Sequence, residues 1–165
     1  MKRIKYLLLL ILLLGIDQGT KYWARAAFMD GDSKSIIPKV LRLVYHENDG
    51  AAWGMFSGKA IFLIGLSILM TIFLIYCFIK MPMTTYYTPL RVLSVVVAAG
   101  AIGNNLIDRI IHGFVIDFIY FELIDFPVFN VADMYIVCGM IAFVAFVLFK
   151  YKDNDFDFLK LKKDK

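Results

Sequence analysis

Residues 60–79 read AIFLIGLSILMTIFLIYCFI, an uncharged apolar run bracketed by Lys59 and Lys80. A bilayer hydrocarbon core of about 30 Å requires about 20 such residues in a helix. The run therefore predicts a membrane-spanning helix, and it decides the class of fold. The whole chain agrees, because 61% of its 165 residues are hydrophobic and only 19% are charged. A soluble domain averages about 45 to 50% apolar residues, so we expect lipid to surround most of this chain.

Two apolar runs towards the C-terminus predict two more spans. Residues 88–107 are interrupted only by Arg91, and their many small residues allow close helix packing. Residues 132–149 form the second run, which a tail at 150–165 rich in Lys and Asp follows. Because this tail has few apolar residues, we expect it to be solvated, and to be dispensable beyond Asp153.

The first apolar run, at residues 6–16, has two interpretations. It follows a basic N-terminus and precedes Ala24-Arg25-Ala26, which together resemble a cleavable secretory signal. However, the polar stretch from Asp17 to Lys21 separates the run from that cleavage site, and three further spans favour a retained anchor. We therefore expect a helix over residues 4–24. The prediction is an all-α integral membrane protein with four transmembrane helices and a single domain.

The distribution of charge predicts the orientation in the membrane. With both termini inside, eleven of the 18 Lys and Arg residues lie inside, whereas only four of the 14 acidic residues do. This bias favours an N-in, C-in topology with residues 25–59 and 108–131 outside. Within 35–45, alternation of residue type also predicts a short strand pair. The expected β structure is thus a small extracytoplasmic segment between the first and second helices.

Several classes of function are unsupported. The net charge of +4 does not suggest nucleic-acid binding, because the basic residues lie at the ends of apolar runs. His46 and His112 are not at metal-ligand spacing, so we expect no metal and no other cofactor. No serine lies in a Gly-x-Ser-x-Gly motif. Carboxylates remain as candidates for chemistry.

Polar side chains in three predicted spans reach a common depth. At about 1.5 Å per residue from the inner helix ends, Asp17 lies about 20 Å deep, Asn104 about 21 Å and Asp133 about 24 Å. This level is just below the outer interface of a core about 30 Å thick. Because ionisable groups are costly inside a bilayer, each is a functional candidate. A site at this depth could act on the outer end of another protein's membrane segment.

Two carboxylates could form such a site without a metal. Asp108, Asp117, Asp125 and Asp133 lie near the outer ends of the last two spans. When two carboxylates lie close together in an apolar setting they share a proton, so that one acts as a base towards water and the other as an acid. Such a pair hydrolyses peptides. Spacing alone does not decide which carboxylate is the partner of Asp133.

Structural interpretations compete with each of these roles. Asp133 could be only a helix N-cap, because Asp is preferred there. Asp108 could form a local ion pair with Arg109. Asp17 and Lys21 have the i, i+4 spacing of a helical salt bridge, and for Asp17 we favour this structural role.

Five short segments form an ordered set of motifs along most of the chain: Asp17-Gln18-Gly19-Thr20-Lys21, Asn48-Asp49-Gly50-Ala51-Ala52-Trp53-Gly54, GAIGNNLIDR at 100–109, VIDF at 115–118 and FNVAD at 129–133. Together they resemble the lipoprotein signal peptidases, also called signal peptidase II. The resemblance implies that Asp117 and Asp133 are a catalytic dyad. It also implies a set of residues that bind substrate or support the dyad, namely Asn48, Gly50, Asn104, Asp108, Arg109, Asn130 and Ala132, with Asp17 and Lys21 as structural support.

The resemblance also implies the substrate and the location. The substrate would be a prolipoprotein that carries diacylglycerol on a cysteine, cut just before that cysteine. The protein would be a multi-pass protein of the bacterial cytoplasmic membrane, surrounded by lipid, with its site near the extracytoplasmic face. We expect a monomer. Trp53 near the outer interface could contact substrate or serve only as an interface anchor.

Three rival functions are weighed against this one. A small transporter or proton conductor would need polar groups across the whole core, but residues 60–79 contain few beyond Ser67 and Thr71. A presenilin-type protease would need a Gly-x-Gly-Asp motif, which the sequence lacks. A membrane assembly subunit can be excluded only by measuring activity.

Overall fold

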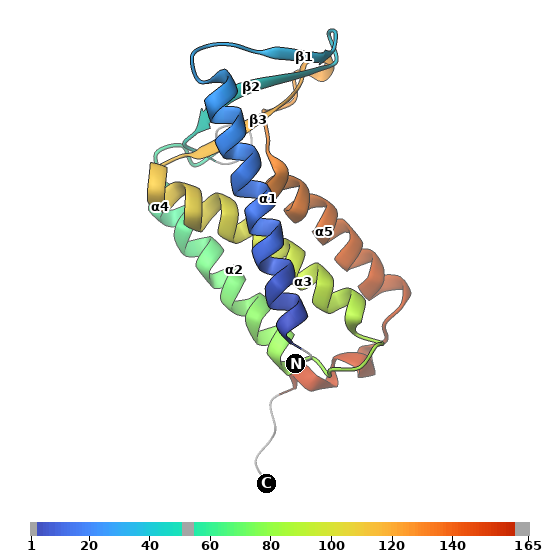
Figure 1. Cartoon of the computed structure of the whole chain (residues 1–165). Helices are drawn as coiled ribbons and strands as arrows, with labels where there is room; N and C mark the ends of the chain where they lie inside the picture. The colour runs from blue at the N-terminus through green and yellow to red at the C-terminus, as the bar shows by residue number, and fades with distance from the viewer. Residues whose placement is uncertain (1–2, 51–54, 161–165) are drawn as a thin grey trace.

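The computed structural model describes residues 3–50 and 55–160 (Figure 1). Within these residues, four helical stretches are long and apolar enough to cross a membrane. They are α1 (Ile4–Phe28), α2 (Ala60–Lys80), the continuous stretch Thr88–His112 and α5 (Val131–Phe149). The four spans expected from sequence are therefore confirmed as helices.

The third span is the central helix of the bundle. It comprises α3 (Thr88–Ala101), the π-helical turn η2 (Ile102–Asp108) and the short α4 (Arg109–His112), so it extends beyond the predicted end at residue 107. α3 packs against α1, α2 and α5. In its most apolar part 61% of residues are buried, against 11 to 22% in the other three spans. The other helices therefore present most of their surface to lipid.

Small residues let α3 and α5 approach closely. A Cβ atom added at Gly100 would lie 2.5 Å from the carbonyl oxygen of Ala132, and one at Gly139 would lie 2.9 Å from Cγ2 of Val97. Close backbone approach of this kind replaces the hydrophobic effect as the source of helix association in lipid. It also brings the start of α5 against η2, where the polar residues lie.

A three-stranded antiparallel sheet lies at one end of the bundle, which we call the sheet end (Figure 1). The predicted strand pair is present as β1 (Lys34–Ile37) and β2 (Leu41–Asn48). A third strand that the sequence did not predict, β3 (Val115–Phe121), follows the third span and pairs with β2. Residues 115–118 are all buried, so β3 lacks the alternation that marks a half-exposed strand.

The opposite end, which we call the termini end, is closed by the C-terminal tail. After α5 the chain forms a 3₁₀-helix, η4 (Asp153–Leu159). Tyr151 is buried against Met81 and Leu90, and Phe156 and Phe158 pack on this cluster. The expectation of a solvated tail is therefore wrong for Tyr151, Phe156 and Phe158, whereas the lysines at 150, 152 and 160 are exposed. Its few apolar residues are aromatic, and each buries a large area.

Candidate active site

Asp117 lies on β3 in a buried position. The carboxyl group is 1% exposed and accepts two hydrogen bonds, at 2.8 Å from Nδ2 of Asn48 and at 2.6 Å from Nδ2 of Asn130. Burial is the main cause that raises the pKa of Asp117 to about 7, and the negative charge of Asp133 adds to it. The two amide donors act in the opposite direction, because they stabilise the charged form. Asp117 is therefore a carboxyl group that can hold or release a proton near neutral pH.

Asp133 lies in the first turn of α5, three residues after the N-cap Asn130. The two residues form a capping box: the Asn130 backbone N–H donates to Oδ2 of Asp133 at 3.0 Å, and the Asp133 backbone N–H donates to Oδ1 of Asn130 at 3.1 Å. Oδ1 of Asp133 accepts from Nδ2 of Asn104 at 2.7 Å. The interpretation of Asp133 as the N-cap is thus wrong. Its carboxylate supports the helix start from the N3 position while it faces Asn104.

Asn130 links the two carboxyl groups. Its side chain is fully buried. Besides its bond to Asp117, Nδ2 donates to Oδ1 of Asn104 at 3.0 Å and to the carbonyl oxygen of Ile116 at 3.2 Å. One amide therefore ties β3, η2 and α5 together. The sequence motif predicted that Asn130 lies at the site, but not this bridging geometry.

Lys21 is the centre of a buried ionic cluster behind Asn104. Its Nζ donates at 2.6 Å to Oδ1 of Asn104 and forms ion pairs at 2.8 Å with Asp17 and 2.9 Å with Asp108. Lys21, Asp17 and Asp108 are each at most 1% exposed. The i, i+4 salt bridge is confirmed. The ion pair of Asp108 with Arg109 is corrected, because Asp108 pairs with Lys21 instead.

Lys21 also orients Asn104. Because Lys21 has only donors, Oδ1 of Asn104 must face it. Nδ2 of Asn104 is then directed at Asp133. Asn104 lies in the π-helical turn η2, and such turns often occur at functional sites.

The cluster also fixes the start of α5. Oδ1 of Asp17 accepts from the backbone N–H of Ala132 at 3.1 Å. Gly103 allows this approach, since a Cβ there would lie 2.4 Å from Oδ2 of Asp17. Sequence reasoning missed Gln18, whose Nε2 donates to Asp17 at 3.0 Å and to Asp108 at 2.8 Å. Its position beside Asp17 in the first motif was the available signal.

Arg109 holds the turn that carries Asn48. Its guanidinium donates to Oδ1 of Asn105 at 3.1 Å, to the carbonyl oxygen of Asp49 at 3.2 Å and to that of Gly50. The Gly50 backbone N–H in turn donates to Oδ1 of Asn48 at 2.9 Å. The Asn48 amide is thereby oriented so that Nδ2 faces Asp117.

A cavity of about 190 Å³ at the sheet end contains both Asp117 and Asp133. Its polar wall includes Asn48, Asn104 and Arg109, whereas Leu63, Leu66, Val115 and Ile136 form an apolar wall. A peptide carbonyl and a water molecule could therefore meet the carboxyl groups next to an apolar surface.

Other candidates lie elsewhere. Asp125 accepts a hydrogen bond from the Tyr120 hydroxyl at 2.6 Å on the exposed surface, and it does not line this cavity. Ala51–Gly54 of the second motif, including Trp53, lie outside the described residues. In the part of the chain that the structure describes, no cluster of three or more His, Cys, Asp or Glu could hold a metal ion.

Comparison with known proteins identifies the family. A family model described as signal peptidase (SPase) II matches residues 9–149, most of the chain. The chain belongs to the signal peptidase II family. A lipoprotein signal peptidase of Lactococcus lactis subsp. cremoris (strain MG1363) is 40% identical over 147 residues, covering 87% of this chain and 95% of the relative. One of Staphylococcus aureus (strain JH9) is 39% identical over 144 residues, covering 86% of each chain.

A solved structure supports the same assignment. It is described as a bacterial membrane enzyme determined by the in meso method at 2.3 Å resolution, and it matches with a TM-score of 0.76 and 35% identity over 98% of this chain and 94% of the other. As a signal peptidase II, this chain is a multi-pass bacterial membrane protease that processes lipoproteins by cleaving the signal peptides of their precursors.

Proposed function

We propose that Asp117 and Asp133 form an aspartic dyad that cleaves diacylglyceryl-modified prolipoproteins just before the lipid-modified cysteine. The observation that carries the proposal is that both carboxyl groups face one cavity and are joined through Asn130. The pKa of Asp117, raised to about 7 chiefly by burial, supports it further, because the dyad then retains one proton at neutral pH.

We assign that proton to Asp117 and the negative charge to Asp133. The Asp133 carboxylate accepts one backbone and one side-chain N–H and lies at the start of α5. Asp117 also accepts two N–H donors, so the donors do not distinguish the two groups. The positive end of the helix dipole favours the negative charge on Asp133, because its carboxylate lies in the first turn of α5. Asp117 lies on β3, and its contact with the start of α5 is through the side chain of Asn130.

The reaction follows from these charges. The oxygen of a water molecule bonds to the scissile carbonyl carbon as one water proton passes to Asp133, while Asp117 gives its proton to the carbonyl oxygen. The resulting gem-diol collapses as the C–N bond breaks. Asp133 returns its proton to the leaving nitrogen, and a gem-diol hydroxyl returns a proton to Asp117. The dyad is thus restored, and no metal or cofactor takes part.

The cavity walls are consistent with a lipid-modified substrate. The polar wall can hold the extended backbone at the cut, whereas Leu63, Leu66 and Ile136 offer an apolar surface at the same level. We propose that the active form is a monomer in the bacterial cytoplasmic membrane, with lipids around it and prolipoproteins as its substrates.

The test is cleavage by the purified protein. Diacylglyceryl-modified prolipoprotein and the same precursor without the lipid are incubated with wild type, Asp117→Asn, Asp133→Asn and the double variant, and intact masses identify the cut. Only the modified precursor should be cut, leaving the modified cysteine as the first residue. Either single variant should abolish turnover and the double variant should add nothing, because the pair acts as one unit. Asp125→Asn is the matched control and should remain active. Cleavage by either single dyad variant would reject the proposed pair.

The proposed orientation is N-in and C-in, with the sheet end outside. It is tested by single cysteines at Ser33 and Thr85 in a background that lacks Cys77 and Cys138. An impermeant thiol reagent added to intact cells should label the cysteine at position 33 and not the one at position 85. The opposite labelling would place the dyad on the cytoplasmic side.

A further inference from the structure

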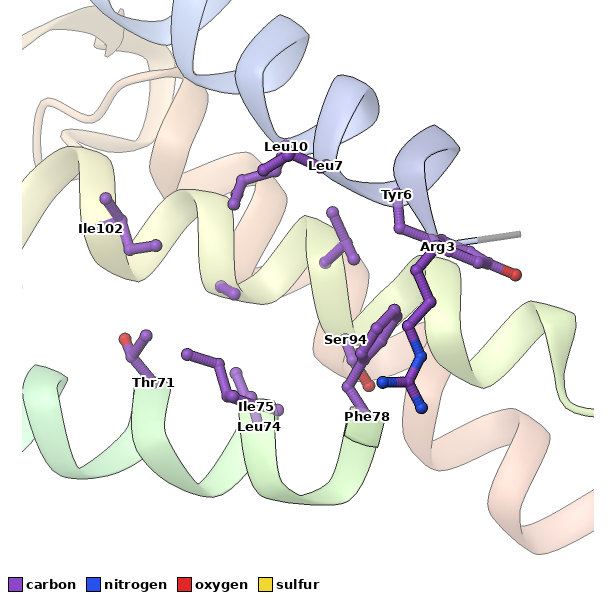
Figure 2. Close-up of a pocket in the computed structure, with 12 residues that line it drawn as sticks. Arg3, Tyr6, Leu7, Leu10, Thr71, Leu74, Ile75, Phe78, Ser94 and Ile102 are labelled. Carbon is purple, nitrogen blue, oxygen red and sulfur yellow. The ribbon is translucent and has the colours of Figure 1, made fainter. Parts of the chain in front are cut away.

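A second cavity, of about 280 Å³, lies between α1 and α2 towards the termini end (Figure 2). Tyr6 and Leu10 of α1 form one wall, and Leu74 and Phe78 of α2 form the other. Small residues of α3, among them Ala98, form the floor. We call this cavity the apolar cleft. It shares no lining residue with the cavity that contains Asp117 and Asp133.

The lining of the apolar cleft restricts its occupant. Apart from Arg3, Thr71 and Ser94, its lining residues are hydrophobic. Such a surface suits a hydrocarbon chain or the apolar segment of another helix.

A polar cavity of about 290 Å³ adjoins the mouth of the cleft. It is lined by two cations, Lys5 and Arg91, and by the threonines at positions 84, 85 and 88. A hydrogen bond connects the linings of the two cavities: the Tyr6 hydroxyl, in the apolar cleft, accepts from Nε of Arg91, in the polar cavity, at 3.0 Å. The polar cavity also lies at the start of α3, where the helix dipole favours an anion.

The charge at the mouth of the cleft distinguishes a signal peptide from an anionic lipid as its occupant. The cleft mouth carries Arg3, whose guanidinium donates to the Ile79 carbonyl oxygen at 3.3 Å and so joins the ends of α1 and α2. Together with Lys5 and Arg91, it would repel the basic N-terminal region of a signal peptide. The same cations attract an anionic headgroup.

We propose that the two cavities form one binding site for an anionic phospholipid of the leaflet at the termini end. The phosphate lies beside Lys5 and the three threonines. The buried Arg91 contributes its positive charge, because its guanidinium already donates to oxygen atoms of the protein. One acyl chain enters the apolar cleft between α1 and α2. The site does not depend on the proposed peptidase chemistry, and its test does not use activity.

The experiment measures lipid retention by native mass spectrometry. Protein is released from nanodiscs that contain phosphatidylcholine mixed with phosphatidylglycerol. Wild type should retain one phosphatidylglycerol molecule in preference to phosphatidylcholine. Lys5→Gln should weaken that preference about fivefold, the effect expected for one cation near a lipid headgroup. Lys80→Gln is the matched control, because Lys80 lies at the same end over the Tyr76 ring and lines neither cavity.

A second variant tests the acyl chain. Leu10→Trp narrows the cleft from its wall and should reduce retention of both lipids, while melting temperature in detergent verifies the fold. Equal retention of the two lipids by wild type would overturn the proposal. So would equal loss in Lys5→Gln and Lys80→Gln, which would indicate surface charge alone. Displacement of the retained lipid by a synthetic signal peptide would assign the cleft to the substrate instead.

Discussion

Replacing Asn48 by Ala should shift the basic limb of the pH–activity profile to higher pH. Nδ2 of Asn48 donates to Asp117 at 2.8 Å, and this bond lowers the pKa of Asp117 because it stabilises the charged form. Without it, the pKa of Asp117 must rise above about 7. In the proposed mechanism Asp117 acts as the acid, so it would keep its proton, and the enzyme its activity, to higher pH.

The size of the shift follows from the strength of the bond. A hydrogen bond to a charged group contributes about 1.5 to 3 kcal/mol. At about 1.36 kcal/mol per pKa unit, this corresponds to a shift of about one to two units. The pKa of Asp117 can only rise, because burial and the charge of Asp133 raise it and the lost Asn48 bond was lowering it.

The assay is kcat/KM for diacylglyceryl-modified prolipoprotein between about pH 5 and 10, which reports groups of the free enzyme. Wild type should lose activity above about pH 7, and Asn48→Ala should lose it about one to two units higher, with a lower maximum. Asp125→Asn is the control, since the Asp125 carboxylate accepts from the Tyr120 hydroxyl at the surface and does not line the cavity that contains Asp117. An unchanged basic limb in Asn48→Ala would refute the role of Asp117 as the acid.

Three further predictions concern stability. Gly103→Ala should lower the yield of folded protein and reduce the free energy of unfolding by about 1 to 3 kcal/mol, because its Cβ would lie 2.4 Å from Oδ2 of Asp17. Gly15→Ala is the control, since a Cβ there faces open space; equal melting temperatures of the two variants would contradict the close contact at Gly103. Truncation after Asp153 removes Phe156 and Phe158 from the cluster around Leu90, and it should lower the free energy of unfolding by about 2 kcal/mol or more. An unchanged melting temperature would show that the tail is dispensable, as the sequence suggested. Because the pKa of Asp117 is raised from 3.8 to about 7, its contribution to stability is fully present below about pH 4 and is lost as pH rises through 7. The melting temperature of wild type relative to Asp117→Asn should therefore fall between about pH 4 and 8, and a constant difference would exclude the raised pKa.

The spans and one salt bridge could be predicted because they depend on local sequence. A run such as 60–79 is apolar enough to enter a bilayer whatever its neighbours do. The Asp17 and Lys21 pair follows from helical spacing alone and is present at 2.8 Å. The common depth of Asp17 and Asn104 could also be counted along their helices, and both contact Lys21.

Other features could not be predicted because they depend on contacts between distant segments. Nothing local distinguishes Asp117 from Asp108 or Asp125 as the partner of Asp133, and only the family resemblance chose it. In the structure, β2–β3 pairing buries Asp117 beside Asn48, whereas Asp108 faces Lys21 and Asp125 faces solvent.

The same holds for the bridge through Asn130 and for the aromatic contacts of the tail. Asn130 reaches Asp117 only because β3 is held against the start of α5. Phe156 and Phe158 can pack on the cluster around Leu90 only once the helices have assembled into the bundle. Hydrophobicity along the chain therefore determined which segments enter the membrane, since burial in lipid requires no partner. The arrangement of the carboxyl groups was decided by tertiary structure, because a buried polar side chain is stable only where another segment supplies its hydrogen bonds.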